Sequence, residues 1–79
     1  MMARIYITLK PAVLDPQGKA VQSALQTLGF GTVQDVRVGK YIELRLNSTD
    51  REEANADVKK MCEKLLANTV IESYRYDIE

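Results

Sequence analysis

The stretch "VQDVRVGKYIELRL" (residues 33–46) decides the predicted fold, because it places two strand-like runs on either side of a Gly-Lys pair. In each run apolar residues alternate with polar residues, which is the period of a β-strand with one buried face. A Gly-X pair between two such runs is a signal for a two-residue hairpin, although a longer loop also fits. The stretch therefore predicts a β-hairpin that turns at Gly39-Lys40.

A helix is predicted on the N-terminal side of this hairpin, within "LDPQGKAVQSALQTLGFG" (residues 14–31). Asp15 is the expected N-cap, Pro16 occupies the first helical position, and Gly29 is the expected left-handed C-terminal cap. Gly18 weakens the first turn, so an irregular loop is an alternative start. Apolar residues recur at helical spacing and form one stripe: Ala20, Val21, Ala24, Leu25 and Leu28.

A second helix is predicted within "STDREEANADVKKMCEKLLANT" (residues 48–69), where Asp50 and Glu53 have the spacing of a capping box. Its apolar stripe consists of Ala54, Val58, Met61, Cys62, Leu65 and Leu66. The two ends of the chain, "ARIYITLK" (residues 3–10) and "VIESYRYDIE" (residues 70–79), again alternate between apolar and polar residues. They predict the two remaining strands.

The predicted order is strand, helix, strand, strand, helix, strand, in a single domain that covers residues 1–79. Its two halves are similar, because Val33–Val38 falls on Ile71–Tyr76 when moved by 38 positions. Two such right-handed units joined by a hairpin form a ferredoxin-like βαββαβ two-layer sandwich of the α+β class. Its four-stranded antiparallel sheet carries two helices on one face. The alternation assigns these residues to the open face: Arg4, Tyr6, Thr8, Asp35, Arg37, Tyr41, Glu43, Arg45, Arg75 and Asp77.

The small size of the chain predicts that it associates. A chain of 79 residues buries only about 60 to 65% of the surface that its unfolded form exposes, so its own core is marginal. Cys62 is the only cysteine and histidine is absent, so neither an internal disulfide nor an ordinary zinc site can reinforce the fold. The predicted edge strands contain no proline and no inward-facing lysine to block pairing. We therefore expect a homodimer or a larger homo-oligomer.

The charge balance argues against a nucleic acid as the partner. Eleven basic and eleven acidic side chains cancel, which leaves no net field to attract a polyanion. No apolar run exceeds three residues, and the N-terminus lacks the hydrophobic segment of a signal peptide. We therefore expect no membrane partner and a cytoplasmic location.

No catalytic, cofactor-binding or metal-binding residue is predicted. Cys62 lies in the apolar stripe of the second helix, which favours a buried structural thiol over a nucleophile. The run Asp15–Gly18 precedes a helix, where an anion could dock, but helix capping explains it about as well. Tyr6 and Tyr41 on an open sheet are similar to the base-stacking aromatics of RNA-recognition domains, yet the basic surface of those domains is missing.

Three runs resemble the PurS family, the small subunit of phosphoribosylformylglycinamidine synthase. They are "LKPAVLDPQGKAVQSALQTLGF" (residues 9–30), "VRVGKYIEL" (residues 36–44) and "MCEKLLANTVIESYRYDIE" (residues 61–79). The Leu-Asp-Pro-Gln-Gly and Met-Cys-Glu-Lys-Leu-Leu-Ala-Asn runs are the most distinctive parts. The doubled methionine at the start and the loop "NSTDREEANAD" (residues 47–57) are the least family-like.

The resemblance implies a scaffold subunit of a glutamine-dependent, ATP-consuming carbon–nitrogen ligase in purine biosynthesis. In the family's complex a synthetase subunit (PurL) uses ATP to activate an amide oxygen, and a glutaminase subunit (PurQ) releases ammonia. The small subunit is thought to bridge the two and to assist ammonia transfer. The resemblance further implies the ferredoxin-like fold, a homodimer or larger homo-oligomer, and no cofactor on this chain. ATP and magnesium are expected on the synthetase subunit.

The residues expected to contact partners are those that the core does not require. They are Asp15, Pro16, Gln17, Gly18, Arg37, Lys40, Tyr41, Asn68 and Thr69. Turn formation and strand packing are the alternative explanation for all of them. The alternative function is a small-molecule-sensing regulatory domain, since such domains share the βαββαβ order and bind ligands at dimer interfaces.

Overall fold

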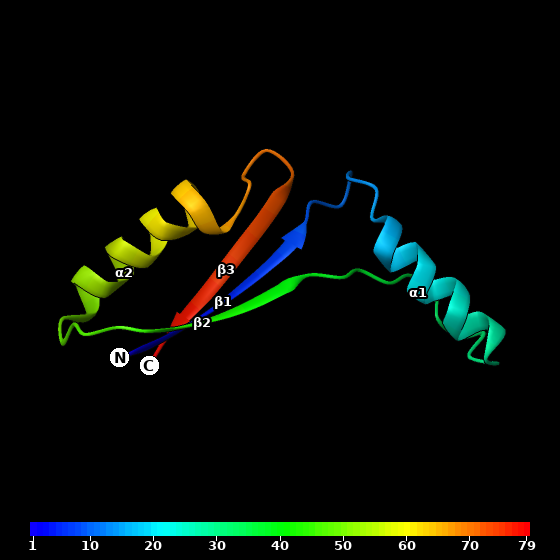
Figure 1. Ribbon diagram of the computed structural model, residues 1–79, viewed down its shortest axis with the longest axis horizontal. Helices are drawn as coiled ribbons and strands as arrows, with labels where there is room; N and C mark the ends of the chain where they lie inside the picture. Colours follow the sequence, from blue (N-terminus) through cyan, green and yellow to red (C-terminus); the bar gives the residue numbers. More distant parts are fainter.

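The computed structural model describes residues 1–79 as one antiparallel sheet with two helices (Figure 1). In chain order the elements are β1 (Met2–Leu9), α1 (Pro16–Thr27), β2 (Lys40–Arg45), α2 (Arg51–Met61), the π-helical turn η1 (Cys62–Leu66) and β3 (Glu72–Ile78). The strands lie in the order β2-β1-β3. The predicted α+β class is confirmed, but the sheet of this chain has three strands instead of the predicted four.

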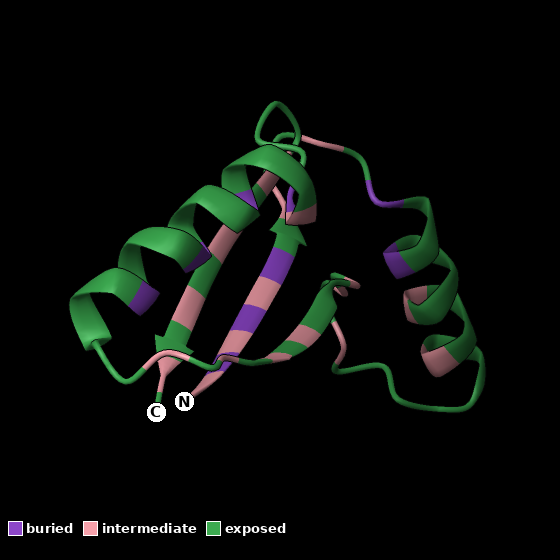
Figure 2. Cartoon of the chain, turned by 60° about the vertical axis from the view of Figure 1, so that its left-hand side comes forward, coloured by how far each residue is buried: buried purple, intermediate pink, exposed green.

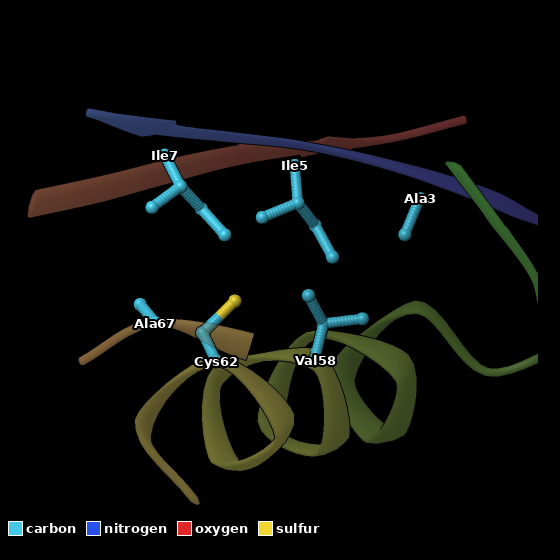
Figure 3. Close-up of a cluster of buried hydrophobic side chains, with 6 residues drawn as sticks. All are labelled: Ala3, Ile5, Ile7, Val58, Cys62 and Ala67. Carbon is cyan, nitrogen blue, oxygen red and sulfur yellow. The ribbon is translucent and has the colours of Figure 1, made fainter. Parts of the chain in front are cut away.

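β1 forms the centre of the sheet and supplies half of the core. Along β1, Ala3, Ile5 and Ile7 are buried while the residues between them are not, as the period-two pattern requires. These side chains point toward Val58 and Cys62 on the helical segment that covers this face (Figure 3). Only 9 of 79 residues are buried, so the interior is small even for a short chain.

Ile5→Ala should lower the free energy of unfolding by about 3 kcal/mol, because it leaves a cavity that its neighbours fill poorly. Ile5 lies in the central strand and has no exposed surface. Urea unfolding at a fixed protein concentration measures the change. Leu14→Ala, at a side chain that is 70% exposed, is the control and should stay within about 0.5 kcal/mol. Equal losses in the two variants would contradict the central role of Ile5.

α2 begins directly after its N-cap residue, Asp50, and lies over the inner face of the sheet (Figure 1). Oδ1 of Asp50 accepts a hydrogen bond from the N–H of Glu52 at 3.0 Å, which confirms the predicted N-cap. The reciprocal half of a capping box is absent, because the N–H of Asp50 donates to Oγ of Ser48 at 3.2 Å instead of to Glu53. Acidic side chains in the first turn and lysines in the last turn complement the helix dipole.

α1 stands away from the sheet, which is the largest departure from the predicted fold (Figures 1 and 2). It starts after the N-cap Asp15 and ends before Gly29, whose φ of 101° is the left-handed conformation of a helix cap. Both predicted caps are therefore confirmed. The prediction that two helices cover one face of the sheet is wrong within this chain, because α2 covers the sheet and α1 extends beyond its end. We call residues 10–39, which connect β1 to β2 and include α1, the arm.

Residues 33–39 are extended but belong to no strand, so the predicted hairpin at Gly39-Lys40 is wrong. The chain passes through Gly39 into β2 without reversing (Figure 1). A Cβ atom on Gly39 would collide with the carbonyl oxygen of Ile7. The residue is therefore glycine because β1 passes so closely, and not because a turn needs it. Of the two similar runs in the sequence, only the second, which supplies most of β3, has a strand partner in this chain.

The molecule is elongated as a result. It measures 49 × 24 × 14 Å with a radius of gyration of 16.0 Å, whereas a compact domain of this length has a radius of gyration of about 12 Å. The arm accounts for the difference, since it extends along the longest axis in Figure 1.

Candidate functional site

The base of the arm is held together by Asp15, at the point where two segments of the chain cross. Oδ1 of Asp15 accepts a hydrogen bond from the N–H of Gly18, and Oδ2 accepts one from the N–H of Val38, both at 2.8 Å. The side chain is buried, and these two bonds compensate for the loss of water. One carboxylate thus caps α1 and ties its first turn to the segment that leads into β2.

The same bonds make the attachment of the arm sensitive to pH. The N–H groups of Val38 and Gly18 lower the pKa of Asp15 below its ordinary value of 3.8. The stabilisation by the carboxylate is therefore present above the ordinary aspartate pKa and lost as the pH falls through the lowered value. NMR titration should give an Asp15 midpoint below 3.8, with the Val38 amide resonance moving in step. Asp15→Asn should abolish that movement, and an Asp15 midpoint at or above the ordinary value would contradict the geometry.

Arg37 and Gly18 tighten the same crossing. The guanidinium of Arg37 donates to the carbonyl oxygens of Val13 at 2.7 Å and Pro11 at 2.8 Å. A Cβ atom on Gly18 would collide with the carbonyl oxygen of Val36, so only glycine allows the two segments to approach this closely. The arm is therefore fixed at its base by several bonds and by close packing.

Glu72, at the start of β3, contacts two further predicted contact residues, Lys40 and Asn68, near this crossing. Its Oε1 accepts a hydrogen bond from the N–H of Asn68 at 2.7 Å, and its Oε2 lies 3.7 Å from Nζ of Lys40. Together with Asp15 and Gln17, Lys40 and Glu72 line a shallow pocket of about 190 Å³. Of the predicted contact residues, Pro16 and Thr69 are exposed beside this region. Sequence reasoning missed Glu72, because an acidic residue within an alternating strand gives no local signal of its role.

Tyr41 follows Lys40 in β2, and it lies opposite Tyr6 on the face of the sheet that α2 does not cover. Its ring centroid is 5.2 Å from that of Tyr6, and Cζ of Arg75 lies 4.0 Å above the Tyr6 ring. Tyr41 remains 52% exposed. The alternation had placed these side chains on the open face, and they form an aromatic and cationic patch of the kind that protein interfaces favour.

Two apolar surfaces of the chain remain uncovered. The first is a groove of about 510 Å³ between β2 and the helical segment that follows Asp50, lined by Leu44, Asp57, Lys60, Met61, Lys64, Leu65 and Leu66. Leu65 at its rim is 82% exposed. The second surface is the apolar side of α1, where Leu28 is 72% exposed and Val21 is also exposed. Adjacent exposed apolar side chains mark interaction sites in soluble proteins.

The structure contains a buried cysteine and no cluster of metal-binding side chains. Cys62 is a buried free thiol, and burial raises its pKa, as a structural cysteine requires. No three side chains of the metal-binding types His, Cys, Asp and Glu lie together. Neither α1 nor α2 combines the length and the hydrophobicity that crossing a bilayer demands.

Comparison with known proteins gives one consistent result. Residues 2–79 match the family model described as PurS, phosphoribosylformylglycinamidine (FGAM) synthase. The phosphoribosylformylglycinamidine synthase subunit PurS of Bacillus subtilis is 58% identical over 76 residues, which cover 96% of this chain and 89% of that protein.

Solved structures agree with this result. A Bacillus subtilis PurS structure has a TM-score of 0.89 at 56% identity and covers 99% of this chain and 96% of that chain. A chain of the structure described as PurLQS from Thermotoga maritima has a TM-score of 0.83 at 32% identity, covering 98% of this chain and 96% of that chain. On the match of nearly its whole length in both sequence and fold, this chain belongs to the PurS family.

Proposed function

We propose that this chain is the small subunit of phosphoribosylformylglycinamidine synthase in purine biosynthesis. In this role it bridges the synthetase (PurL) and glutaminase (PurQ) subunits and assists ammonia transfer in the cytoplasm. The relatives named as PurS subunits of this synthase, and the likeness to a chain of a PurLQS structure, support the assignment. ATP and magnesium belong to the synthetase subunit in this proposal, and this chain supplies binding surfaces.

The observation that carries the proposal is the separation of α1 from the sheet. An apolar helix face and an apolar groove beside α2 are each left without a partner in the same chain. Exposing both costs free energy in water, and association removes that cost. We therefore expect both apolar surfaces to be buried by association with other molecules.

The first of these molecules is a second copy of the chain. The free edge of β2 accepts the extended residues 33–38 of the other copy as a fourth strand, and α1 of that copy fills the groove beside α2. The exchange is reciprocal and follows a two-fold axis. Each half of the dimer then has the four-stranded sheet with two helices on one face that the sequence pattern favours, assembled from two chains as a ferredoxin-like unit.

The dimer in turn offers surfaces for the catalytic subunits. The cluster around Glu72, with Lys40 and Asn68, adjoins the patch formed by Tyr41, Tyr6 and Arg75, because Lys40 lines a pocket of about 310 Å³ together with Tyr6 and Arg75. The two-fold symmetry of the dimer repeats this surface, which allows one dimer to hold more than one subunit in a fixed relation. Such a relation shortens the path of ammonia and limits its protonation by water, which would remove its nucleophilicity.

Reconstitution tests the bridging role. Synthetase and glutaminase subunits are assayed for product formation with glutamine or with ammonium salt, each with and without this chain. We expect omission of the chain to abolish most of the glutamine-dependent rate while the ammonium-dependent rate stays high. The proposal fails if both rates are independent of the chain, or if the chain alone turns over the substrates.

A further inference from the structure

We infer that the two copies pair in one defined register, in which Arg37 lies opposite Glu43 of the second copy and Asp35 lies opposite Arg45. This inference rests on the proposed dimer and names the side chains that align it. The register follows from the directions of the backbone groups, from the apolar faces and from the charges of the two strands.

The backbone of residues 34–39 makes no hydrogen bond to another backbone group. The groups that have partners point toward α1: the carbonyl of Gln34 accepts from Gln22, and the N–H of Val38 donates to Asp15. Successive residues of an extended chain present their backbone groups to opposite sides. Asp35 and Arg37 therefore present both their N–H and their C=O groups to the outside.

β2 has a matching free edge. Met1 and Leu46 exchange two backbone hydrogen bonds, at 3.1 and 2.7 Å. The antiparallel register of β1 and β2 then directs the backbone groups of the even-numbered residues of β2 toward β1. Tyr41, Glu43 and Arg45 present theirs to the free edge. Hydrogen bonding thus requires odd-numbered residues of the arm to face odd-numbered residues of β2.

Charge selects among the two-fold registers that remain. An axis at Gly39 places Asp35 opposite Glu43, and an axis at Tyr41 places Arg37 opposite Arg45. Like charges directly opposite each other destabilise a strand pair. An axis at Lys40 places Arg37 opposite Glu43 and Asp35 opposite Arg45, and symmetry supplies each pair twice. It also places Lys40 opposite its own copy, but each of these lysines has a carboxylate partner in its own chain, Glu72 at 3.7 Å.

The inner face of the sheet favours the same register. With the axis at Lys40, Val38 lies opposite Ile42 and Val36 opposite Leu44, all four of which are only partly buried in one chain. With the axis at Gly39, Val38 would lie opposite the charged Lys40. Of the three axes, only the one at Lys40 combines opposite charges on the outer face with the apolar pairs Val38–Ile42 and Val36–Leu44 on the inner face. The two copies of Lys40 meet at the axis itself, where each is already paired with Glu72.

The charged groups are available for these contacts. The three ion pairs of the chain are Arg4–Glu79, Lys40–Glu72 and Arg75–Asp77. Asp35, Glu43 and Arg45 therefore have no ionic partner within their own chain. Arg37 uses two of its side-chain N–H groups on carbonyl oxygens, and the remaining donors can bind a carboxylate.

Single cysteines test the position of the axis. In a Cys62→Ala background, Lys40→Cys should form a disulfide-linked dimer under mild oxidation. Directly opposite residues in a non-hydrogen-bonded pair have Cα atoms about 4.5 Å apart, within the range that a disulfide spans. Tyr41→Cys is the matched control and should remain mostly unlinked, because its own copy lies diagonally across the sheet. Efficient linking through position 41 instead of 40 would overturn the register.

Charge reversal tests the ion pairs. Asp35→Arg and Arg45→Asp should each raise the dimer dissociation constant by about tenfold at low salt, since an attraction becomes a repulsion at two symmetric sites. The double variant should restore the dissociation constant to near that of the unmodified protein. Glu53→Arg, on the exposed flank of α2, is the control for a change in net charge and should have little effect. Sedimentation over a range of concentrations measures the constants.

The outcomes separate this inference from the proposed dimer. Tighter association of Asp35→Arg would indicate the axis at Gly39, and tighter association of Arg45→Asp the axis at Tyr41. Either result would contradict the proposed register but not the dimer, and so would a double variant whose dissociation constant is as high as those of the single variants. If the unmodified chain is monomeric at all concentrations, both the proposed dimer and the register are wrong.

Discussion

Leu28→Asp should turn the protein into monomers and leave the fold of the single chain intact. Leu28 is 72% exposed at the end of α1, so a charge there costs the isolated chain little. In the proposed dimer the same side chain lies in the apolar groove of the second copy, where an unpaired carboxylate is expensive. We expect the dissociation constant to rise by about a hundredfold or more, because two such sites are lost in every dimer.

Sedimentation velocity and far-ultraviolet circular dichroism together measure this effect. Thr27→Asp is the control, because it places the same charge at the neighbouring position, away from the apolar stripe. A dimeric Leu28→Asp variant would show that the exposed side of α1 is not the interface. Loss of helical signal in both variants would place the damage in α1 itself.

Gly39→Ala should lower the free energy of unfolding by about 3 kcal/mol, the upper range for a side chain forced into a closed space. The added methyl group meets the carbonyl oxygen of Ile7 and the Cγ2 atom of Thr8. The backbone of β1 cannot yield without disturbing its pairing with Lys40. Destabilisation should appear in the isolated chain as well as in the dimer.

Gly31→Ala is the matched control for this change. No atom lies within 4 Å of a Cβ placed at Gly31, so its stability should change by no more than about 0.5 to 1 kcal/mol, and upward if at all. Chemical denaturation at several protein concentrations separates folding from association. Equal behaviour of the two glycine variants would contradict the close approach at Gly39.

Local sequence patterns predicted the strand β1 correctly but assigned the wrong role to Gly39. The alternation around Ile5 predicted a strand with one buried face, and the caps Asp15 and Asp50 predicted the helix starts, because each of these signals depends on residues close in sequence. The signal at Gly39 was equally local, but glycine serves a tight turn and a close contact alike. Only the position of the Ile7 carbonyl distinguishes the two, and that contact joins residues far apart in the chain.

The missing fourth strand has a related cause. Hydrophobic period indicates that residues 33–38 are extended with one apolar side, but it carries no information about which chain supplies the neighbouring strand. The similarity between this run and Ile71–Tyr76 predicted equal pairing for both, yet only the second pairs within the chain. Glu72 was missed for the same reason, since its contacts with Lys40 and Asn68 join different parts of the fold.

The outlying position of α1 also sets how the protein responds to dilution. If the apolar side of α1 is buried only in the dimer, the free energy of unfolding depends on protein concentration and decreases on dilution. In the monomer the arm is exposed, and exposed segments are the preferred sites of proteolysis. Digestion by a protease should therefore be faster in dilute than in concentrated solutions of the protein.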